Sequence, residues 1–398
     1  MSHMSIASRR EYLSRIKPTY LKANLDKKTQ MLDDCCSVTG LNRKHAIVCL
    51  SAKTDLAFKT VRQRKARRPT YGNDVVCALK KVWEILDYPC GERLAPMLSE
   101  IVPKLRALKE LSVSDDVADK LSRIGHATVD AKLKKFRSAI RRRIQSTTKP
   151  GSLLKSQIPI RTSSWDEKKL GMVELDTVAH CGESAGGEFA NTLNLTDILT
   201  GWSEQETFMG KAEKRIMQGL TNITERLPFP LKAIDPDNGS EFINWQLYRY
   251  CVERKIEFTR GRPYKKNDNA HVEQKNWTHV RKVFGYARIE DDDVVALMND
   301  VNRDELHLYK NFFQPTIKLV DKKRVGKHKE KIKRVYDRAR TPYRRVLECA
   351  HVTEEKKQSL TNVYDSLNPA ELRRNIIRKL NLIHKRIAAK RKKLNAPG

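Results

Sequence analysis

The stretch Met172–Ala179, with the sequence MVELDTVA, decides how the middle of this chain folds. It is short and mostly apolar, as a β-strand is, and it carries Glu174 and Asp176 two residues apart, which places both carboxylates on one face of the strand. Residues 189–200 and 202–209 follow after glycine-containing bends and have the same character. Three such segments joined by short turns predict an antiparallel meander.

Helices and strands are expected to alternate after this meander. Pro228 marks the end of the first helix, because proline cannot continue one, and the turn-forming Asp237-Asn238-Gly239 follows the next strand. The expected helices are 211–227, 243–254 and a longer one from 269, with two further strands at 231–234 and 256–259. The pattern predicts an α/β region with a mixed five-stranded sheet.

Three acids stand out in this region: Asp176 in the first strand, Asp237 after the fourth, and Glu273 near the start of the late helix. Converging carboxylates can hold two divalent cations roughly 3.5 to 4 Å apart and so support an in-line phosphoryl transfer. Hard oxygen ligands suit Mg²⁺ or Mn²⁺. A capping or surface role would explain one of these acids well and all three together poorly.

These residues make the region 171–311 resemble the catalytic core of retroviral integrases and of the bacterial insertion-sequence transposases that share its RNase H-like fold. The likeness is carried by Glu174-Leu175-Asp176, by the sequence DNGSEF at 237–242 and by NAHVEQKN at 269–276. The 35 residues between Asp237 and Glu273 are typical of that family's Asp, Asp, Glu (DDE) triad. The zinc-binding His/Cys domain of retroviral integrases has no counterpart here, so the closer resemblance is to the bacterial transposases.

The resemblance implies a DNA transposase in which Asp176, Asp237 and Glu273 are catalytic and hold two Mg²⁺ or Mn²⁺ ions. Such an enzyme hydrolyses a strand at each transposon end to free a 3′-OH, and then joins that hydroxyl to target DNA. The implied partners are transposon-end DNA, target DNA and further copies of the chain, as a homodimer or higher oligomer. The alternatives are a related metal-dependent nuclease that does not join strands, and a DNA-binding regulator with an inactive core.

Neighbouring polar residues compete for roles at this site. Asp235 is interpreted as a turn cap, and Glu174 as a neighbour of the metal ligands. Asp197, near the end of the second strand, could approach the site, and His180 is expected to be a hairpin histidine more than a general base, since metal ions can activate water without one.

The late helix continues beyond Glu273 with Asn276, Trp277, Val280 and Arg281, which share one flank if the helix is a regular α-helix. Trp277 and Val280 are expected in the core. Asn276 and Arg281 are expected to reach DNA phosphates beside the metal ions, with a solvated face as the alternative.

The charge distribution agrees with a nucleic-acid partner. The 398 residues contain 79 Lys and Arg against 48 Asp and Glu, a net charge of +31. Residues 1–170 carry +19, residues 171–320 carry −4, and residues 321–398 carry +16. Two basic arms around an acidic centre are expected when the arms hold a polyanion and the centre gathers carboxylates around cations.

The first arm contains three candidate helix-turn-helix units. In the first, Gly40 separates residues 28–38 from a helix that Asn42 caps; Asn73 and Ser114 are the expected caps of the other two. Plain helical packing with solvated charges is the alternative. The candidate DNA-binding residues of this arm are Arg43, Lys44, Lys132, Lys134, Arg141, Arg142 and Arg143.

The last arm is expected to form a basic β-ribbon from 316–320 and 332–336, followed by an amphipathic helix at 368–394 whose apolar stripe docks a second copy or the chain's own core. The chain as a whole is therefore expected to be multidomain. The expected parts are a helix-turn-helix domain (5–65), a second helical DNA-binding region (66–144), a linker (145–165), the catalytic core (166–312) and a basic DNA-binding or oligomerisation region (313–398).

The sequence also predicts where the protein resides. No apolar run approaches the roughly 18 residues of a membrane span, and the N-terminus lacks the pattern of a secretory signal. We expect a cytoplasmic, nucleoid-associated protein of a bacterium, with no membrane partner.

Overall fold

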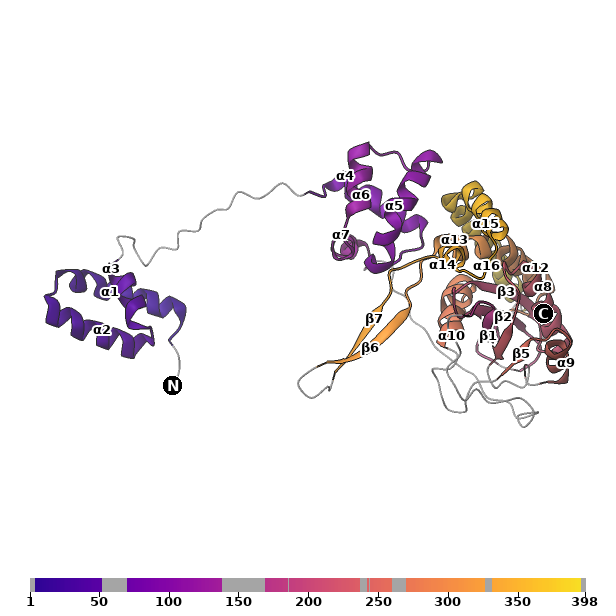
Figure 1. Ribbon diagram of the computed structural model, residues 1–398, viewed down its shortest axis with the longest axis horizontal. Coiled ribbons are helices and arrows are strands. Elements are labelled where there is room, and N and C mark those ends of the chain that lie inside the picture. The colour runs from indigo at the N-terminus through magenta and orange to yellow at the C-terminus, as the bar shows by residue number, and fades with distance from the viewer. Residues whose placement is uncertain are drawn as a thin grey trace. The chain divides into compact units, whose positions relative to one another are not determined.

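The computed structural model describes residues 4–51, 70–137, 169–184, 186–236, 242, 244–259, 270–325 and 331–394. The chain divides into two compact units, Met1–Thr70 and Tyr71–Gly398 (Figure 1). Each unit is held together by contacts among its own residues. Among the described helices, none has a stretch long and apolar enough to cross a membrane.

The first unit is a small helical bundle of α1 (Ile6–Lys22), α2 (Leu25–Thr39) and α3 (Arg43–Ser51). Gly40 ends α2 with a φ of 69°, a left-handed conformation that glycine adopts without strain. The Asn42 side chain accepts the Lys44 backbone N–H at 3.0 Å and so caps α3. The predicted turn between two helices is therefore present, while α1 was not predicted. The buried core consists of Leu13, Tyr20, Leu32, Cys35, Ala46 and Leu50.

The second unit begins with four helices: α4 (Asn73–Ile85), α5 (Gly91–Ala107), α6 (Asp115–Arg123) and α7 (His126–Arg137). Ser114 caps α6 by accepting the Val117 N–H at 3.4 Å, as predicted. The prediction that Asn73 caps α4 is wrong, because Asn73 is already the first helical residue and Gly72 occupies the cap position.

A five-stranded mixed sheet forms the centre of this unit and confirms the predicted α/β region. Its strands are β1 (Met172–Ala179), β2 (Ala190–Asp197), β3 (Ser203–Met209), β4 (Ala233–Pro236) and β5 (Glu257–Phe258). The order is β3-β2-β1-β4-β5, with β1, β2 and β3 antiparallel and β4 and β5 parallel to β1. β1 is therefore central and β3 is an edge strand.

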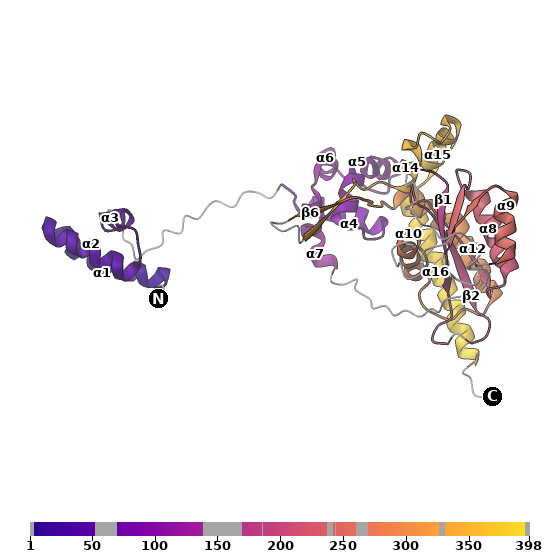
Figure 2. The same ribbon diagram turned by 60° about the horizontal axis from the view of Figure 1, so that its bottom comes forward.

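Helices cover both faces of the sheet (Figure 2). α8 (Glu213–Arg226) lies on the face of Glu204 and Glu206, where Arg226 contacts Glu204 and Asn222 contacts Glu206. The other face carries a continuous helical segment made of α10 (Ala270–Lys275), the π-helix η2 (Asn276–Arg281) and α11 (Lys282–Phe284). The remaining helices of this region are α9 (Trp245–Glu253), α12 (Asp292–Asp300), the π-helix η3 (Val301–Leu306) and α13 (His307–Phe313).

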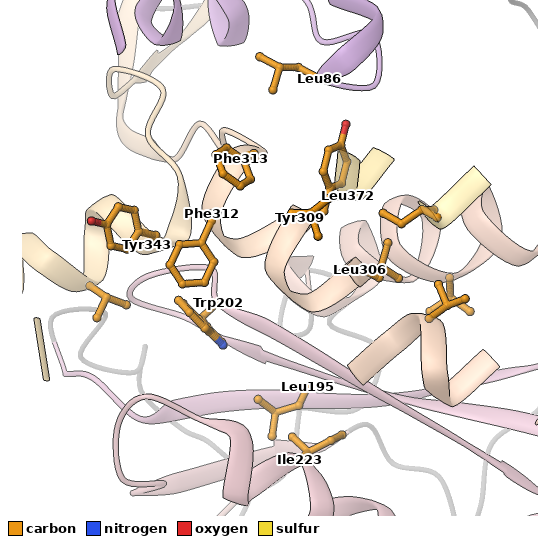
Figure 3. Packing of buried hydrophobic residues seen from close by; sticks show 14 of the residues in the cluster. Leu86, Leu195, Trp202, Ile223, Leu306, Tyr309, Phe312, Phe313, Tyr343 and Leu372 are labelled. Atoms are coloured by element: carbon orange, nitrogen blue, oxygen red, sulfur yellow. The ribbon is translucent and has the colours of Figure 1, made fainter. Parts of the chain in front are cut away.

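The C-terminal part adds a ribbon and three helices. The predicted ribbon is present as β6 (Leu319–Val325) and β7 (Lys331–Tyr336), followed by α14 (Pro342–Glu348), α15 (Glu354–Ser366) and α16 (Pro369–Leu394). Aromatic residues join it to the sheet: Trp202, Phe312 and Tyr343 contact one another in sequence (Figure 3).

The apolar stripe of α16 packs within this chain. Leu372, Ile376, Ile383 and Ile387 are buried in the same cluster as the sheet residues, and α16 contacts α12, η3 and α13. Of the two expected roles of this stripe, docking on the chain's own core is the one observed, so these four residues offer no surface to a second copy.

Candidate active site

Asp176 lies in the middle of the central strand, half-buried. Its Oδ1 accepts the backbone N–H of Thr177 at 2.7 Å, and its Oδ2 accepts the side-chain amide of Asn276 at 2.5 Å. Asn276 is the first residue of η2, where the helix widens to the π form, a change often found at functional sites. The acid is thus bonded directly to the helical segment that carries Glu273.

Glu273 is exposed on α10, three residues before Asn276. Residues three apart on a helix lie on one flank. Because Asn276 is bonded to Asp176, the Glu273 side of this helix lies over the strand of Asp176. Asp176 and Asn276 are therefore in direct contact, and Glu273 lies on the same helical segment one turn before Asn276.

Asp237 lies outside the described residues. The chain reaches it from β4, whose last residue, Pro236, is the register partner of Leu175 on β1. Leu175 is the neighbour of Asp176, so the described chain ends beside the candidate acid immediately before Asp237.

Glu174 is fully buried, and its Oε2 accepts the backbone N–H of Val272 at 2.9 Å. It therefore fastens the start of α10 to β1, which agrees with its interpretation as a neighbour of the ligands. Asp235 pairs in register with Glu174, is buried, and accepts the Thr259 hydroxyl at 2.9 Å. Asp235 lies inside β4, which extends to Pro236, and its interpretation as a turn cap stays a prediction, because the turn that follows lies outside the described residues.

Asp197 and His180 both have structural roles. Asp197 is buried and accepts bonds from the Gly171 N–H at 2.9 Å and from the Thr200 N–H and hydroxyl at 2.7 and 2.6 Å, which fixes the turn between β2 and β3. His180 shares a 2.8 Å hydrogen bond with the Thr192 hydroxyl. Burial, together with the nearby positive charge of Arg281, lowers the pKa of His180 to about 3, so it is neutral near pH 7.

Two buried titratable side chains, Lys275 and His279, lie on the helical segment of Glu273. Lys275 is buried, and burial lowers its pKa to about 7, together with the surrounding cations Lys310, Arg93, Lys318 and Arg345. Burial lowers the pKa of His279 well below its usual value, with Lys275 and Lys310 contributing.

The residues after Asn276 on the helical segment of Glu273 differ in burial and in the contacts they make. Arg281 is half-buried and lies over the Tyr286 ring, 4.9 Å from its centroid. Val280 is buried as predicted, but Trp277 is 39% exposed, so its prediction as a core residue is wrong. Trp277 lies four residues after Glu273, which is also exposed, so it belongs to the exposed side of this helical segment.

In the N-terminal helices, Arg43 forms an ion pair with Asp33, and Lys132 donates from Nζ to the Tyr71 carbonyl at 2.9 Å. Lys44 and Lys134 are exposed and available to a ligand. Arg141, Arg142 and Arg143 lie outside the described residues.

Two residues near the site were missed by the sequence reasoning, Asn194 on β2 and Gln205 on β3. Both are fully buried on the face of Asp176, and Asn194 donates to the side-chain oxygen of Asn276 at 2.8 Å. The available signal was clear only on β2, where Thr192, Asn194 and Thr196 alternate with Leu193 and Leu195; on β3 the neighbours of Gln205 are Glu204 and Glu206, so Gln205 does not stand out there.

The donor set suits a hard divalent cation, because Asp176 and Glu273 both offer carboxylate oxygens. Within the part of the chain that the structure describes, no three His, Cys, Asp or Glu side chains are grouped closely enough to hold a metal ion. The third ligand of the predicted set, Asp237, is not in that part.

No protein-family model matches the sequence. The uncharacterized protein y4rM of Sinorhizobium fredii (strain NBRC 101917 / NGR234) is 36% identical over 324 residues, which cover 81% of this chain and 91% of y4rM.

Similar solved structures include a chain of the simian T-cell lymphotropic virus intasome in complex with PP2A regulatory subunit B56 gamma (TM-score 0.29, 14% identity, 54% of this chain and 69% of that one). They also include the catalytic core domains of HTLV-2 integrase in complex with magnesium (0.27, 13%, 36% and 88%) and of BIV integrase (0.28, 16%, 46% and 96%). Scores this low do not establish a common fold, so the strand order and the contacts of Asp176 carry the assignment below.

Proposed function

The chain belongs to the same family as y4rM, and we propose that it is a metal-dependent DNA transposase whose active site consists of Asp176, Asp237 and Glu273. The hydrogen bond from Asn276 to Asp176 is the observation that carries this proposal. It holds the helix of Glu273 against the central strand, while β4 ends at Pro236 in register with Leu175 of that same strand, one residue before Asp237 in the sequence. A mixed sheet with acids at these three places is what the resemblance to integrase-like transposases implies.

The proposed reaction has two phosphoryl transfers. In the first, the oxygen of a water molecule bonds to the phosphorus at the transposon end, and the 3′ oxygen leaves and takes a proton. In the second, that 3′-OH loses its proton and attacks a target phosphodiester, whose own 3′ oxygen leaves. Two Mg²⁺ or Mn²⁺ ions held by the three carboxylates would supply activation of the nucleophile and stabilisation of the leaving oxygen.

The protein's own residues prepare this site. Glu174 fixes the first turn of α10, and Asn276 orients the Asp176 carboxylate by donating to Oδ2. These interactions set the geometry before DNA arrives, which lowers the reorganisation that the reaction requires.

DNA recognition is assigned to the basic arms. We assign the turn between α2 and α3, with Arg43 and Lys44, and helix α7, with Lys132 and Lys134, to transposon-end DNA. The net charge of +19 over residues 1–170 supports this assignment. The active species is proposed to be a dimer or higher oligomer on DNA, because two ends are joined to one target and one triad processes one strand at a time.

Substitution of each acid by its amide tests the proposal. Asp176→Asn, Asp237→Asn and Glu273→Gln keep side-chain size and remove one anionic ligand. Each should therefore reduce cleavage and joining by more than about 100-fold, the upper range for removal of a group that only orients a metal ligand. End binding should remain, because the basic arms are unchanged. The measurement is a gel assay with pre-cut and uncut ends in magnesium.

Glu225→Gln is the matched control, since Glu225 is on α8, which covers the opposite face of the sheet. Joining at the wild-type level by the Glu273→Gln protein would refute the triad. Cleavage without joining by the wild-type protein would identify a nuclease, and end binding without either reaction would identify a DNA-binding regulator.

A further inference from the structure

We propose that Asn194 and Gln205 are positioning residues for Asp176, acting through Asn276 in a row of hydrogen-bonded side-chain amides that crosses the sheet. The inference rests on the proposed function, because it assigns these residues to the orientation of a metal-binding carboxylate. It adds two residues on strands that carry none of the three acids.

The strand register places the row. Asp176 on β1 lies opposite Asn194 on β2, and Asn194 lies opposite Gln205 on the edge strand β3. Residues directly opposite each other in antiparallel strands point to the same face of a sheet. The three side chains therefore lie side by side under η2, from which Asn276 completes the row.

Each amide donates in the same direction, toward the acid. Gln205 donates from Nε2 to Asn194 Oδ1 at 3.0 Å, and Asn194 donates from Nδ2 to Asn276 Oδ1 at 2.8 Å. Asn276 then donates from Nδ2 to Asp176 Oδ2 at 2.5 Å. Because an ionised carboxylate only accepts, it sets the direction of the whole row, and reversing one amide would turn an oxygen toward another oxygen.

The beginning of the row is held as firmly as its end. Gln205 and Asn194 are fully buried, and the Gln205 backbone carbonyl accepts a bond from Arg226 at 2.9 Å. Within the described residues, Gln205 Oε1 has no hydrogen-bond partner, so the row starts there. Bonds aligned head to tail polarise one another, which strengthens the last bond to Asp176.

The adjacent rows on this face are different. Thr192 and Thr207 bond each other at 2.9 Å, and Thr196 and Ser203 bond each other at 3.1 Å. In these pairs the short side chains satisfy each other's buried hydroxyl groups, and neither pair reaches the helix of Glu273. Amides are present in the one row that contains Asp176, where a longer side chain with a donor at its end is needed to span the distance.

Asn194→Leu and Gln205→Met test the inference, since both keep approximate size and remove the amide. We expect the kcat of strand transfer to fall by about 10- to 100-fold, as when other groups that orient a metal ligand are removed, with the KM for end DNA unchanged. Mn²⁺ binding to the protein alone, measured by calorimetry, should weaken by a similar factor. Asn194→Leu removes both bonds of Asn194, whereas Gln205→Met removes only the bond from Gln205 to Asn194, so a fold defect in one variant leaves the other informative.

Thr207→Val is the matched control, because it removes buried hydrogen bonds to Thr192 and Asn302 on the same face outside the row. It should lower the melting temperature while leaving Mn²⁺ affinity and kcat unchanged. Wild-type Mn²⁺ affinity and kcat in both row variants would overturn the inference, as would an equal loss in Thr207→Val. Full activity of Asp176→Asn would instead refute the proposed function, so the two failures are distinguishable.

Discussion

Glu174 is an acid near the candidate site, and its role is structural. Its Oε2 accepts the Val272 N–H in the first turn of α10, where backbone donors have no partner within the helix. The partial positive charge of a helix start favours a carboxylate at this place. One buried side chain thus determines where the helix of Glu273 begins relative to β1.

Substitution of Glu174 should separate its capping role from its charge. Glu174→Gln keeps an oxygen for the Val272 N–H, whereas Glu174→Leu leaves that buried donor without an acceptor. We expect the leucine variant to be less stable than the glutamine variant by about 1 to 3 kcal/mol, the cost of an unsatisfied buried polar group. Urea denaturation measures the difference, and equal stabilities would contradict the capping role.

At the scale of one element, the β6–β7 ribbon carries many positive charges, and their arrangement does not stabilise the pairing of its two strands. Lys322 lies opposite Arg334 and Lys323 opposite Lys333, and like charges directly opposite each other destabilise a strand pair. A two-stranded ribbon fits the DNA major groove, where phosphates on both sides would offset this repulsion. The Lys318 side chain, which donates to the carbonyls of Ile198 and Leu199, ties the ribbon's base to the sheet.

Neutralising the ribbon should reduce the salt dependence of binding to duplex DNA of arbitrary sequence. Replacing Lys323, Arg324, Lys333 and Arg334 together by Gln should make the slope of log affinity against log salt shallower. The expected change is about 0.9 for each phosphate that the ribbon no longer neutralises. Fluorescence anisotropy over a salt series is the measurement.

The control for the ribbon variant replaces two lysines elsewhere. Lys214 on α8 and Lys356 on α15 are exposed, and their Gln variants should leave the slope unchanged. The assignment of the ribbon to DNA fails if both sets of substitutions change the slope by the same amount per residue.

At the scale of the second unit, one carboxylate joins its helices. Asp87, in the turn between α4 and α5, contacts Lys282 of α11 at 2.6 Å, Arg373 of α16 at 2.9 Å and Lys310 of α13 at 3.7 Å. The Tyr309 hydroxyl also donates to the Ile85 carbonyl at 2.5 Å. The N-terminal helices of this unit, the segment that follows Glu273 and the C-terminal helix therefore meet at Asp87.

The contribution of Asp87 should depend on pH. Burial alone would raise its pKa, but Lys310, Arg373 and Lys282 outweigh burial and hold the pKa below its usual value. The stabilisation is therefore complete above about pH 4, the unfolded-state pKa, and is lost as pH falls through the folded-state value. Asp87→Asn should destabilise the protein at pH 7 by about 3 kcal/mol, because it leaves buried cations without their anion.

Denaturation of the wild type and Asp87→Asn between pH 7 and pH 3 checks this expectation. The difference in unfolding free energy should be constant down to about pH 4 and should narrow below it. A difference that stays the same at the acid end of the series would show that the charge of Asp87 is not what stabilises the junction.

The sequence by itself determined the five strands, the helices that alternate with them and the turn at Gly40, because apolar periodicity and glycine or proline positions act within a few residues. It also indicated Asp176, Asp237 and Glu273, whose catalytic roles stay predictions. The sequence indicated a mixed five-stranded sheet, and the order of its strands came only from the structure.

Only the tertiary structure decided which polar residues meet. Asn194, Gln205 and Asn276 come from three elements, and their row depends on strand register and on the π-helical widening at Asn276, neither of which local periodicity encodes. The structure also places Trp277 on the exposed side of its helix, and two further residues of β4 place Asp235 inside the strand. Hydrogen bonds between residues far apart in the chain exist only once the sheet and its covering helix are packed, and they set the orientation of Asp176.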